Sequence, residues 1–568
     1  MKQHQWILPE ENRPSFQDYP EFHPLLLSIL YKRGLRSSAE ISSFLDKSLH
    51  GIHDPYLMHD MEKTVSRIMQ ALQKKEKILI YGDYDVDGIS AITLLSQFFR
   101  YIQATHEYYI PHRIKEGYGL NMEGIQTARN NNVKLIITVD TGITGHEAIR
   151  EASAYGIDVI VTDHHQSPEN LPPAYAILNP NQPQCQYPYK YLSGVGVVFK
   201  LVHACLKQCG MDETESKRIL KSLLDYVTLG TIADVVPLTG ENRKLVASGL
   251  KQIKLSSFSG IRILFDQTFV EDKPLTPAMI AFKICPKLNA SGRTDHANYS
   301  ARLLLENDPR ECLQLFSKLE LFNRERKALE ENDFTKAIQI IEQDKDHLDK
   351  RILVVAHPSF HPGVNGIVAS RLTDKYHRPS IVMALNDNGF FKASARSIAG
   401  VNIFECLQSC EDLCIAFGGH PFAAGLTLDK SNLQEFTSRI NAYMEKHFST
   451  HVFEPRLQID SFLSFSDITP LLMKGLQDME PFGLGNPEPV FLTKHAVIQN
   501  QPRLLKNKHL KFDVQHAGVT LPVIGFNFSN KAPSLKMNDS IDFVYHLRTN
   551  SWLGQTHTQI ELIDFKKN

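Results

Sequence analysis

The sequence has few of the features that mark disulfide-stabilised, zinc-binding or membrane proteins. It contains eight cysteines in 568 residues, and no two have the C-x-x-C spacing of zinc sites and redox motifs. No hydrophobic run approaches the roughly 18 residues that span a bilayer, and the N-terminal stretch MKQHQWILPEENRPSF has no apolar core of a signal peptide. A disulfide framework and cysteine chemistry are therefore not expected, and we expect a cytoplasmic protein without a membrane partner.

An excess of charge is also absent. The formal net charge is −1, so a polyanion would have to be bound by locally clustered bases, because the field of the whole molecule is close to neutral. The chain is too long for one hydrophobic core, since single cores stop growing at about 250 to 300 residues. With 42% hydrophobic and 22% charged residues, it is expected to form several globular domains.

Short β-rich runs alternate with helical segments between Lys77 and Ile177. The runs KILIY, HEYYI, KLIITV and IDVIVT are separated by segments with helical spacing, such as SAITLLSQFFRYI. This alternation predicts a parallel sheet, and ligands bind such sheets at the carboxyl ends of the strands. The residues directly after each run are therefore candidate site residues.

The rest of the chain predicts three further parts. Residues 298–349 are rich in Leu, Glu, Lys and Arg, which favours long helices, and Pro309 should break or begin one of them. A second, smaller α/β unit begins at RILVVAH and closes with GGHPFAAG. After Phe453, short alternating strands suggest a small β-barrel. The expected fold is α/β, with two lobes built on parallel sheets, a helical spacer and a C-terminal barrel.

Acidic and imidazole side chains follow three successive strands of the first lobe. In GDYDVDG three aspartates stand at two-residue intervals, so their carboxylates would point one way if the segment stays extended. They could instead cap the helix expected to open at Ser90, but capping needs only one acceptor. Oxygen-rich sites suit Mg²⁺ or Mn²⁺. The candidates are Asp83, Asp85, Asp87, Asp140, Asp163, His164 and His165, with Asp234 from the apolar segment TLGTIADVVPL.

Four of these segments, GDYDVDG, VDTG, TDHH and GTIAD, resemble the motifs of the DHH phosphoesterase superfamily. IPHRIKEGYGL, LSGVGVVFKL, LNASGR, GIVASRL, SARSI, GGHPFAAG and PFGLGNPEP resemble segments of its RecJ family, in the same order. The resemblance covers nearly the whole chain. It implies an N-terminal segment over residues 1–75 that packs on the core, a DHH catalytic domain over 76–250, a helical connector over 251–349, a DHHA1 domain over 350–450 and an OB-fold domain over 451–568.

The resemblance also implies a chemistry. It points to a site for two Mn²⁺ or Mg²⁺ ions that hydrolyses phosphodiester bonds without a covalent enzyme intermediate, and to removal of mononucleotides from single-stranded DNA, 5′ to 3′, in repair and recombination. Asp83 would be a further ligand or would orient the ligands, and His165 would contact the phosphate or support His164. Asp225 is a lesser alternative. The implied ligands are Asp85, Asp87, Asp140, His164 and Asp234.

Substrate contacts are implied by the same resemblance. A 5′-phosphate pocket is expected from Arg113, Ser394 and Arg396, since arginine binds phosphate in a bidentate manner, although surface ion pairs are the alternative. Asn289, Arg293 and the GGH segment with Gly418, Gly419 and His420 are expected along the strand. In the barrel a basic groove with an aromatic residue suits single strands, with a solvated strand face as the alternative. Its candidates are Arg503, Lys506, Lys508, Lys511 and Phe512.

Three positions differ from the family pattern: Phe360 and Asn365 stand where Trp and an aliphatic residue are usual, and Lys287 where Arg is common. Two other functions stay open. A DHH-type phosphodiesterase for cyclic dinucleotides or short RNA would not need the barrel, and a catalytically inactive single-strand-binding scaffold would not need an intact acidic set. The expected partners are single-stranded DNA, a single-strand binding protein and a helicase, and the chain is expected to be a monomer.

Overall fold

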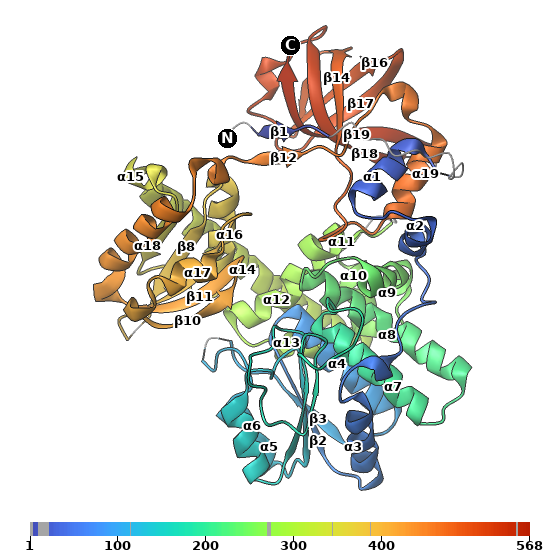
Figure 1. Ribbon diagram of the computed structural model, residues 1–568, viewed down its shortest axis with the longest axis vertical. Helices are drawn as coiled ribbons and strands as arrows, with labels where there is room; N and C mark the ends of the chain where they lie inside the picture. Colours follow the sequence, from blue (N-terminus) through green and yellow to red (C-terminus); the bar gives the residue numbers. More distant parts are fainter. Residues whose placement is uncertain are drawn as a thin grey trace. The chain divides into compact units, whose positions relative to one another are not determined.

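The computed structural model forms two compact units (Figure 1). Unit 1 consists of Met1–Asp46, Thr450–Phe482 and Pro487–Asn568, and unit 2 of Lys47–Ser449 and Gly483–Asn486. The structure describes residues 4–9, 22–113, 115–269, 274–343, 345–386, 388–552 and 555–568. The predicted N-terminal segment, residues 1–75, is thus divided between the two units.

The first sheet of unit 2 has the strand order β3-β2-β4-β5-β6 and is parallel throughout, as predicted. Helices cover both faces, which explains why its strands are apolar almost without interruption. Ile78 and Ile80 face one core and Leu79 and Tyr81 the other. The strands are β2 (Ile78–Gly82), β3 (His106–Tyr109), β4 (Leu135–Val139), β5 (Asp158–Thr162) and β6 (Ala176–Leu178).

Two groups of helices pack on this sheet. The helices α5 (Met122–Asn130) and α6 (His146–Ala154) lie on one face (Figure 1). The other face is covered by α3 (Met61–Gln73), α4 (Val86–Tyr101) and α7 (Gly194–Gln208), followed by α8 (Glu213–Ala233) and α9 (Gly240–Gln252). The sheet is therefore buried between two apolar cores, one on each face.

A helical spacer follows. Its central element is α14 (Pro309–Gln343), which begins at the predicted proline because the proline ring fits the first turn of a helix. Near one end α14 packs on α10 (Ser259–Asp266), α12 (Cys285–Thr294) and α13 (Asn298–Leu305), and near the other on α16 (Asn365–Tyr376). Within the described ranges, none of the helices combines the length and the apolar composition that crossing a membrane requires.

The second sheet of unit 2 has the order β10-β11-β9-β8-β7. Only β7 and β8 are parallel, so this sheet is mixed and the prediction of parallel sheets is wrong for the second lobe, where β9, β10 and β11 run antiparallel to their neighbours. The helix α16 packs on β8 and β9. The remaining elements are β7 (Leu353–His357), β8 (Ser380–Leu385), β9 (Phe390–Arg396), α17 (Ile403–Gln408), β10 (Cys414–His420), β11 (Ala423–Asp429) and α18 (Leu433–His447).

Unit 1 contains the predicted barrel. Its five strands follow the order β14-β18-β19-β17-β16, and pairing of β14 with β16 closes it. The helices α1 (Pro24–Lys32), α2 (Ser38–Leu45) and α19 (Pro470–Met479) share its apolar core, and β1 (Gln5–Ile7) pairs with β12 (Arg456–Gln458). The other strands are β13 (Ser461–Phe462), β14 (Phe491–Ile498), β15 (Arg503–Leu505), β16 (His509–His516), β17 (Val519–Gly525), β18 (Ser540–Trp552) and β19 (Gln555–Lys567).

Candidate metal centre and substrate contacts

The aspartate loop between β2 and α4 does not stay extended as far as Asp87, so the extended arrangement of the three aspartates is wrong. The helix begins at Val86 and not at Ser90, with Asp85 as its cap. The Asp85 Oδ1 atom accepts hydrogen bonds from the backbone N–H groups of Asp87 (2.9 Å) and Gly88 (3.1 Å). Asp85 therefore caps the helix as well as contributing a carboxylate to the site, and Asp87 lies in the first helical turn.

The carboxylate of Asp87 is held by the start of another helix. Its Oδ2 atom accepts from Gly194 N–H at 2.7 Å and its Oδ1 atom from Val195 N–H at 3.0 Å, both in the first turn of α7. A helix N-terminus stabilises negative charge. Burial, with Asp85 nearby, nevertheless raises the pKa of Asp87 to about 7. These two backbone donors were not predicted, since only the packing of α7 on α4 brings them to Asp87.

The ends of β4, β5 and α8 bring the remaining predicted ligands together. The His164 Nε2 atom lies 3.1 Å from Asp140 Oδ1 and 3.5 Å from Asp234 Oδ2. Asp140 has a left-handed backbone (φ 60°), which aspartate tolerates better than most residues. Asp234 directly follows the last residue of α8. Carboxylates from the ends of β4 and α8 therefore meet the imidazole that follows β5.

Seven of the eight candidates, all except Asp163, meet in three overlapping groups, each with ligand atoms within 4.8 Å of one another. Asp225 joins none of these groups; its carboxylate accepts a hydrogen bond from Gln252 Nε2 at 3.0 Å. The groups are Asp83 with Asp85 and Asp140, Asp87 with His164 and Asp234, and Asp140 with His164 and His165.

The charge balance of this cluster fits a divalent cation. Asp83 Oδ1, Asp140 Oδ1, His164 Nε2 and Asp234 Oδ2 are buried and have no hydrogen-bond partner in the described structure. Burial raises the pKa values of the three carboxyls well above their usual range, with the other aspartates adding to the effect, and lowers that of His164 to about 4. Leaving several buried polar atoms unsatisfied is costly. Oxygen ligands with one imidazole are a donor set that Mn²⁺ or Mg²⁺ would satisfy.

His165 is oriented by Asp163, a role that was not predicted. The Asp163 Oδ1 atom lies 2.7 Å from His165 Nδ1 and also accepts from the backbone N–H groups of His164 and His165. Burial opposes charge on His165, but this contact with Asp163 raises its pKa to about 9. The Tyr118 hydroxyl lies 3.3 Å from the same Nδ1 atom. Tyr118 belongs to the IPHRIKEGYGL segment, which could have identified it.

Arginines gather beside the aspartate loop. The Arg113 guanidinium lies 4.9 Å from the centre of the Tyr84 ring. Tyr84 stands between Asp83 and Asp85 in the sequence. On α12, an added Cβ atom at Gly292 would lie 3.3 Å from the Tyr84 carbonyl oxygen, so the LNASGR segment packs on this loop. Arg293 donates to the Gly363 carbonyl at 3.0 Å, and Asn289 is one turn away on the same helix.

We call Arg113, Arg293 and Arg396 the arginine cluster, and their charges repel one another. Burial lowers the pKa of Arg293 to about 9, and Arg113 and Arg396 contribute to the decrease. Burial and Arg113 also lower the pKa of Arg396. Burial is the main cause of this lowering and repulsion between the guanidinium groups adds to it, so an anion bound between them would be favourable.

The second sheet supplies the predicted Ser394 and Arg396 from β9. An added Cβ atom at Gly366, in the first turn of α16, would lie 2.7 Å from an Arg396 nitrogen and 3.7 Å from Ser394 Oγ. A helix N-terminus beside arginine is a favourable place for phosphate. His420 is the last residue of β10. Partial burial of its ring lowers its pKa, and the nearby positive charges of Arg396 and His165 lower it further. Gly418 and Gly419 precede His420 on β10.

The three departures from the family pattern lie in structural positions. Phe360 is buried in the apolar core beside α16. Asn365 is buried, and its Nδ2 atom donates to the Lys392 carbonyl at 2.9 Å. Lys287 forms an ion pair with Glu320.

The barrel exposes a mixed basic and aromatic face on β15, β16 and β17. Arg503 and Lys511 are opposite one another across β15 and β16, and Lys506 and Lys508 are exposed in the connecting turn. Phe512 is only 1% exposed and packs in the barrel core, so its predicted contact with the strand is wrong. Successive side chains of a strand point to opposite faces, and Phe512 is on the face that points into the barrel.

Two other rings replace Phe512 on the outer face. The His509 and Phe526 rings are in edge-to-face contact, with centroids 5.3 Å apart, and Phe526 is 48% exposed. His509 is the Cα partner of Leu505, the last residue of β15, so this pair lies beside the end of that strand. We call Arg503, His509, Lys511 and Phe526 the barrel face.

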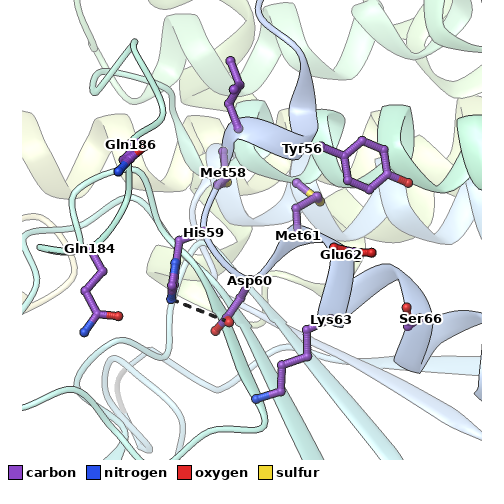
Figure 2. A pocket seen from close by; sticks show the side chains of 11 residues that line it. Tyr56, Met58, His59, Asp60, Met61, Glu62, Lys63, Ser66, Gln184 and Gln186 are labelled. Carbon is purple, nitrogen blue, oxygen red and sulfur yellow. Dashed lines mark ion pairs between the residues drawn. The ribbon is translucent and has the colours of Figure 1, made fainter.

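A separate hollow of about 670 Å³ lies at the start of α3. Figure 2 shows its polar lining, with His59 and Asp60 paired at 3.7 Å. The lining residues come from 56–63, Ser66, Gln184 and Gln186. The hollow is therefore formed by residues other than those of the metal centre.

Comparison with known proteins agrees with this geometry. Residues 77–231 match the DHH family, N-terminal domain, residues 349–446 the DHHA1 domain and residues 459–564 the RecJ OB domain. The single-stranded-DNA-specific exonuclease RecJ of Bacillus subtilis is 35% identical over 543 residues, which cover 95% of this chain and 68% of the relative. The chain belongs to the RecJ family.

Other RecJ proteins match nearly the whole of this chain. The RecJ of Dickeya dadantii is 35% identical over 96% of this chain and 97% of its own. The crystal structure of RecJ in complex with Mn²⁺ from Thermus thermophilus matches with a TM-score of 0.83 at 29% identity, over 99% of this chain and 80% of that chain. This chain therefore shares its α/β fold, with two sheets, a helical spacer and a barrel, with that RecJ structure.

Proposed function

We propose that the chain is a metal-dependent exonuclease that removes mononucleotides from single-stranded DNA in the 5′ to 3′ direction, in repair and recombination. The convergence of seven acidic and imidazole side chains, four of them with a buried atom that lacks a hydrogen-bond partner, is the observation that carries the proposal. Membership of the RecJ family supports the choice of substrate, since the relatives are named as single-stranded-DNA-specific exonucleases.

The residues of the cluster have distinct roles in this proposal. Two Mn²⁺ or Mg²⁺ ions would supply Lewis-acid activation of water and neutralise charge on the phosphodiester. Asp83 orients the neighbouring carboxylates, and His165, fixed by Asp163, contacts the phosphate. Backbone donors of α7 hold Asp87, so that the cluster is preorganised. The ligands are Asp85, Asp87, Asp140, His164 and Asp234.

The arginine cluster is proposed to bind the substrate backbone. Arg113, Ser394 and Arg396 take the 5′-phosphate, because guanidinium groups and the start of α16 converge there. Asn289, Arg293, Gly419 and His420 line the path of the strand. Contacts of this type recognise phosphates and sugars and carry no base specificity.

The barrel face is proposed to bind single-stranded DNA further along. Arg503 and Lys511 provide charge, and His509 and Phe526 provide rings on which bases stack. Strands 2 and 3 of an OB-fold are the surface that usually binds oligonucleotides, and β16 and β17 correspond to them by their order in the barrel. The proposed domains are 76–250, 251–349, 350–450 and 451–568, preceded by residues 1–75. Since its substrate is DNA undergoing repair, we propose that the chain works in the cytoplasm as a monomer beside a single-strand binding protein and a helicase.

Digestion of oligonucleotides labelled at the 5′ or the 3′ end tests the proposal. With Mn²⁺ or Mg²⁺, a 5′-labelled strand should release labelled mononucleotide at once, whereas a 3′ label should stay on progressively shorter products. Chelator and Asp140→Asn should both stop release. Asp225→Asn is the matched control, because this aspartate lies outside the cluster, and it should keep activity.

Each result that differs from these expectations would refute a different part of the proposal. Early release of the 3′ label would refute the polarity. Hydrolysis in chelator would refute the metal requirement. Cleavage of dinucleotides without cleavage of long strands would favour the phosphodiesterase, and single-strand binding without any hydrolysis would favour the inactive scaffold.

A further inference from the structure

The loop that follows the ligand Asp234 has a strained backbone. Val235 adopts a left-handed conformation (φ 57°), which is unusual for a β-branched residue, and its side chain is 62% exposed. Such conformations cluster at functional sites and persist only where the surrounding structure holds them. The position of Asp234 therefore depends on the contacts made by the next residues, Val236–Thr239.

Two side chains of the catalytic domain hold part of this loop. The Tyr189 hydroxyl donates to the carbonyls of Pro237 (3.1 Å) and Thr239 (2.8 Å), and Asn242 Nδ2 donates to the Pro237 carbonyl at 3.1 Å. Between them, the N–H group of Leu238 donates to the carbonyl of Leu484 at 2.7 Å. The last contact comes from the PFGLGNPEP segment, which has no role in the proposed chemistry.

The four residues Gly483–Asn486 form a closed turn. Gly483 N–H donates to the Asn486 carbonyl at 2.9 Å and Asn486 N–H to the Gly483 carbonyl at 3.1 Å. Gly485 has φ 74°, and Asn486 is fully buried. These four residues belong to unit 2, whereas the chain before and after them belongs to unit 1.

The turn fits the loop closely. An added Cβ atom at Gly483 would lie 2.7 Å from Leu238 Cδ1, and one at Gly485 would lie 3.1 Å from Pro237 Cβ and from Thr239 Cγ2. Both distances are shorter than normal carbon contacts. Gly485 is thus required both by its backbone conformation and by this close approach.

We propose that the turn Gly483–Asn486 is a positioning element of the metal centre. It holds Leu238, restrains the strained Val235 and so keeps Asp234 directed at His164. The inference rests on the proposed assignment of Asp234 as a metal ligand. It gives the PFGLGNPEP segment a function: the chain that carries the barrel is connected covalently to a support of the catalytic carboxylate.

Isothermal titration calorimetry of the full-length protein with Mn²⁺ tests the inference. Gly485→Ala should weaken binding of the ion held by Asp234 by about 10- to 100-fold, the usual effect of losing a residue that orients a metal ligand. Gly518→Ala is the matched control. Gly518 also has a positive φ (77°), in the turn between β16 and β17, but an added Cβ atom there meets no atom within 4 Å. It should cost a similar backbone strain and leave Mn²⁺ affinity unchanged.

A second pair of variants covers the case in which Gly485→Ala does not fold. Gly483→Ala places a methyl group against Leu238 Cδ1, so it should also weaken Mn²⁺ binding. Adding Leu238→Val removes the obstructing atom and should restore affinity. Equal affinity in wild type and Gly483→Ala, or failure of the second substitution to restore it, would contradict the inference.

The result separates this inference from the proposed function. If the wild type binds no Mn²⁺, or if Asp234→Asn binds as the wild type does, the metal assignment itself is wrong. If the wild type binds, Asp234→Asn loses affinity and Gly485→Ala matches Gly518→Ala, the metal assignment stands and the positioning role is refuted.

Discussion

The backbone of Gly194 packs directly against the side chain of Asp140. An added Cβ atom at Gly194 would lie 2.5 Å from the Asp140 Cβ atom and against its carboxylate. The same residue donates its N–H group to Asp87 at 2.7 Å. One glycine at the start of α7 thus fixes the spacing of two proposed metal ligands.

Gly194→Ala should therefore damage the metal centre. We expect a loss in turnover of about 100-fold, since displacement of a catalytic group by about 1 Å has effects of this size, together with weaker Mn²⁺ binding. Single-turnover assays and calorimetry measure the two effects. Gly196→Ala, two residues on in the same helix, is the control, because a Cβ atom there would make ordinary contacts at 3.4 Å. Equal turnover in both variants would contradict the prediction.

Arg396→Lys should reduce the preference for a 5′-phosphate. Lysine keeps the charge but loses the planar pair of donors that binds phosphate in a bidentate manner. We expect the ratio of kcat/KM for 5′-phosphorylated over 5′-hydroxyl oligonucleotides to fall about tenfold, equivalent to about 1.4 kcal/mol. Lys392→Ala, on the same strand but exposed and bonded to Thr427, should leave the ratio unchanged. An unaltered ratio in Arg396→Lys would place the phosphate elsewhere.

Phe526→Ala should weaken binding of long single strands. Removing one stacking ring costs about 1 to 3 kcal/mol per base, and Phe526 is exposed on the barrel face. Fluorescence anisotropy with oligonucleotides of increasing length should show the loss only for strands long enough to reach the barrel. Val519→Ala, an exposed apolar residue at the other end of β17, is the control. A loss of equal size in both variants would argue against stacking at Phe526.

Asp225→Asn should stabilise the protein at alkaline pH. Burial raises the folded-state pKa of Asp225 from its ordinary 3.8 to about 6. The folded state therefore holds the proton more tightly than the unfolded state, so this contribution to stability is complete below pH 3.8 and is lost as the pH rises through 6. The difference corresponds to at most about 3 kcal/mol. Asparagine keeps the acceptor for Gln252 and removes the cost of the buried charge.

Thermal unfolding at pH 5 and pH 8 measures this effect. The melting temperature of Asp225→Asn should exceed that of the wild type at pH 8, and the gap should narrow at pH 5. Mn²⁺ affinity should be unchanged at both values. A variant that is less stable at pH 8, or that loses Mn²⁺, would show that the carboxylate is needed in its ionised form.

The local pattern of the sequence was enough to predict the strands and the polar residues at their carboxyl ends. Apolar runs of four to six residues between helical segments identified the parallel sheet, and its topology required Asp83, Asp140 and His164 to share one edge. The spacing within GDYDVDG was less informative. It suggested an extended segment, but the capping hydrogen bonds of Asp85 start the helix at Val86.

Other features depended on contacts between distant segments. Phe512 follows four basic residues in the sequence, but the pleat of β16 directs it into the barrel, and Phe526, which comes directly after β17, takes the outer position. The backbone donors to Asp87, the role of Asp163 beside His165 and the support of Leu238 by Leu484 leave no sign in hydrophobic periodicity.

The sequence by itself determined which side chains could form the site, because side-chain period and turn chemistry are local properties that each segment carries. Only the tertiary structure decided how these side chains are held. Their partners are backbone groups, and a backbone N–H or carbonyl is the same in nearly every residue type, so its position depends on packing between elements far apart in the chain.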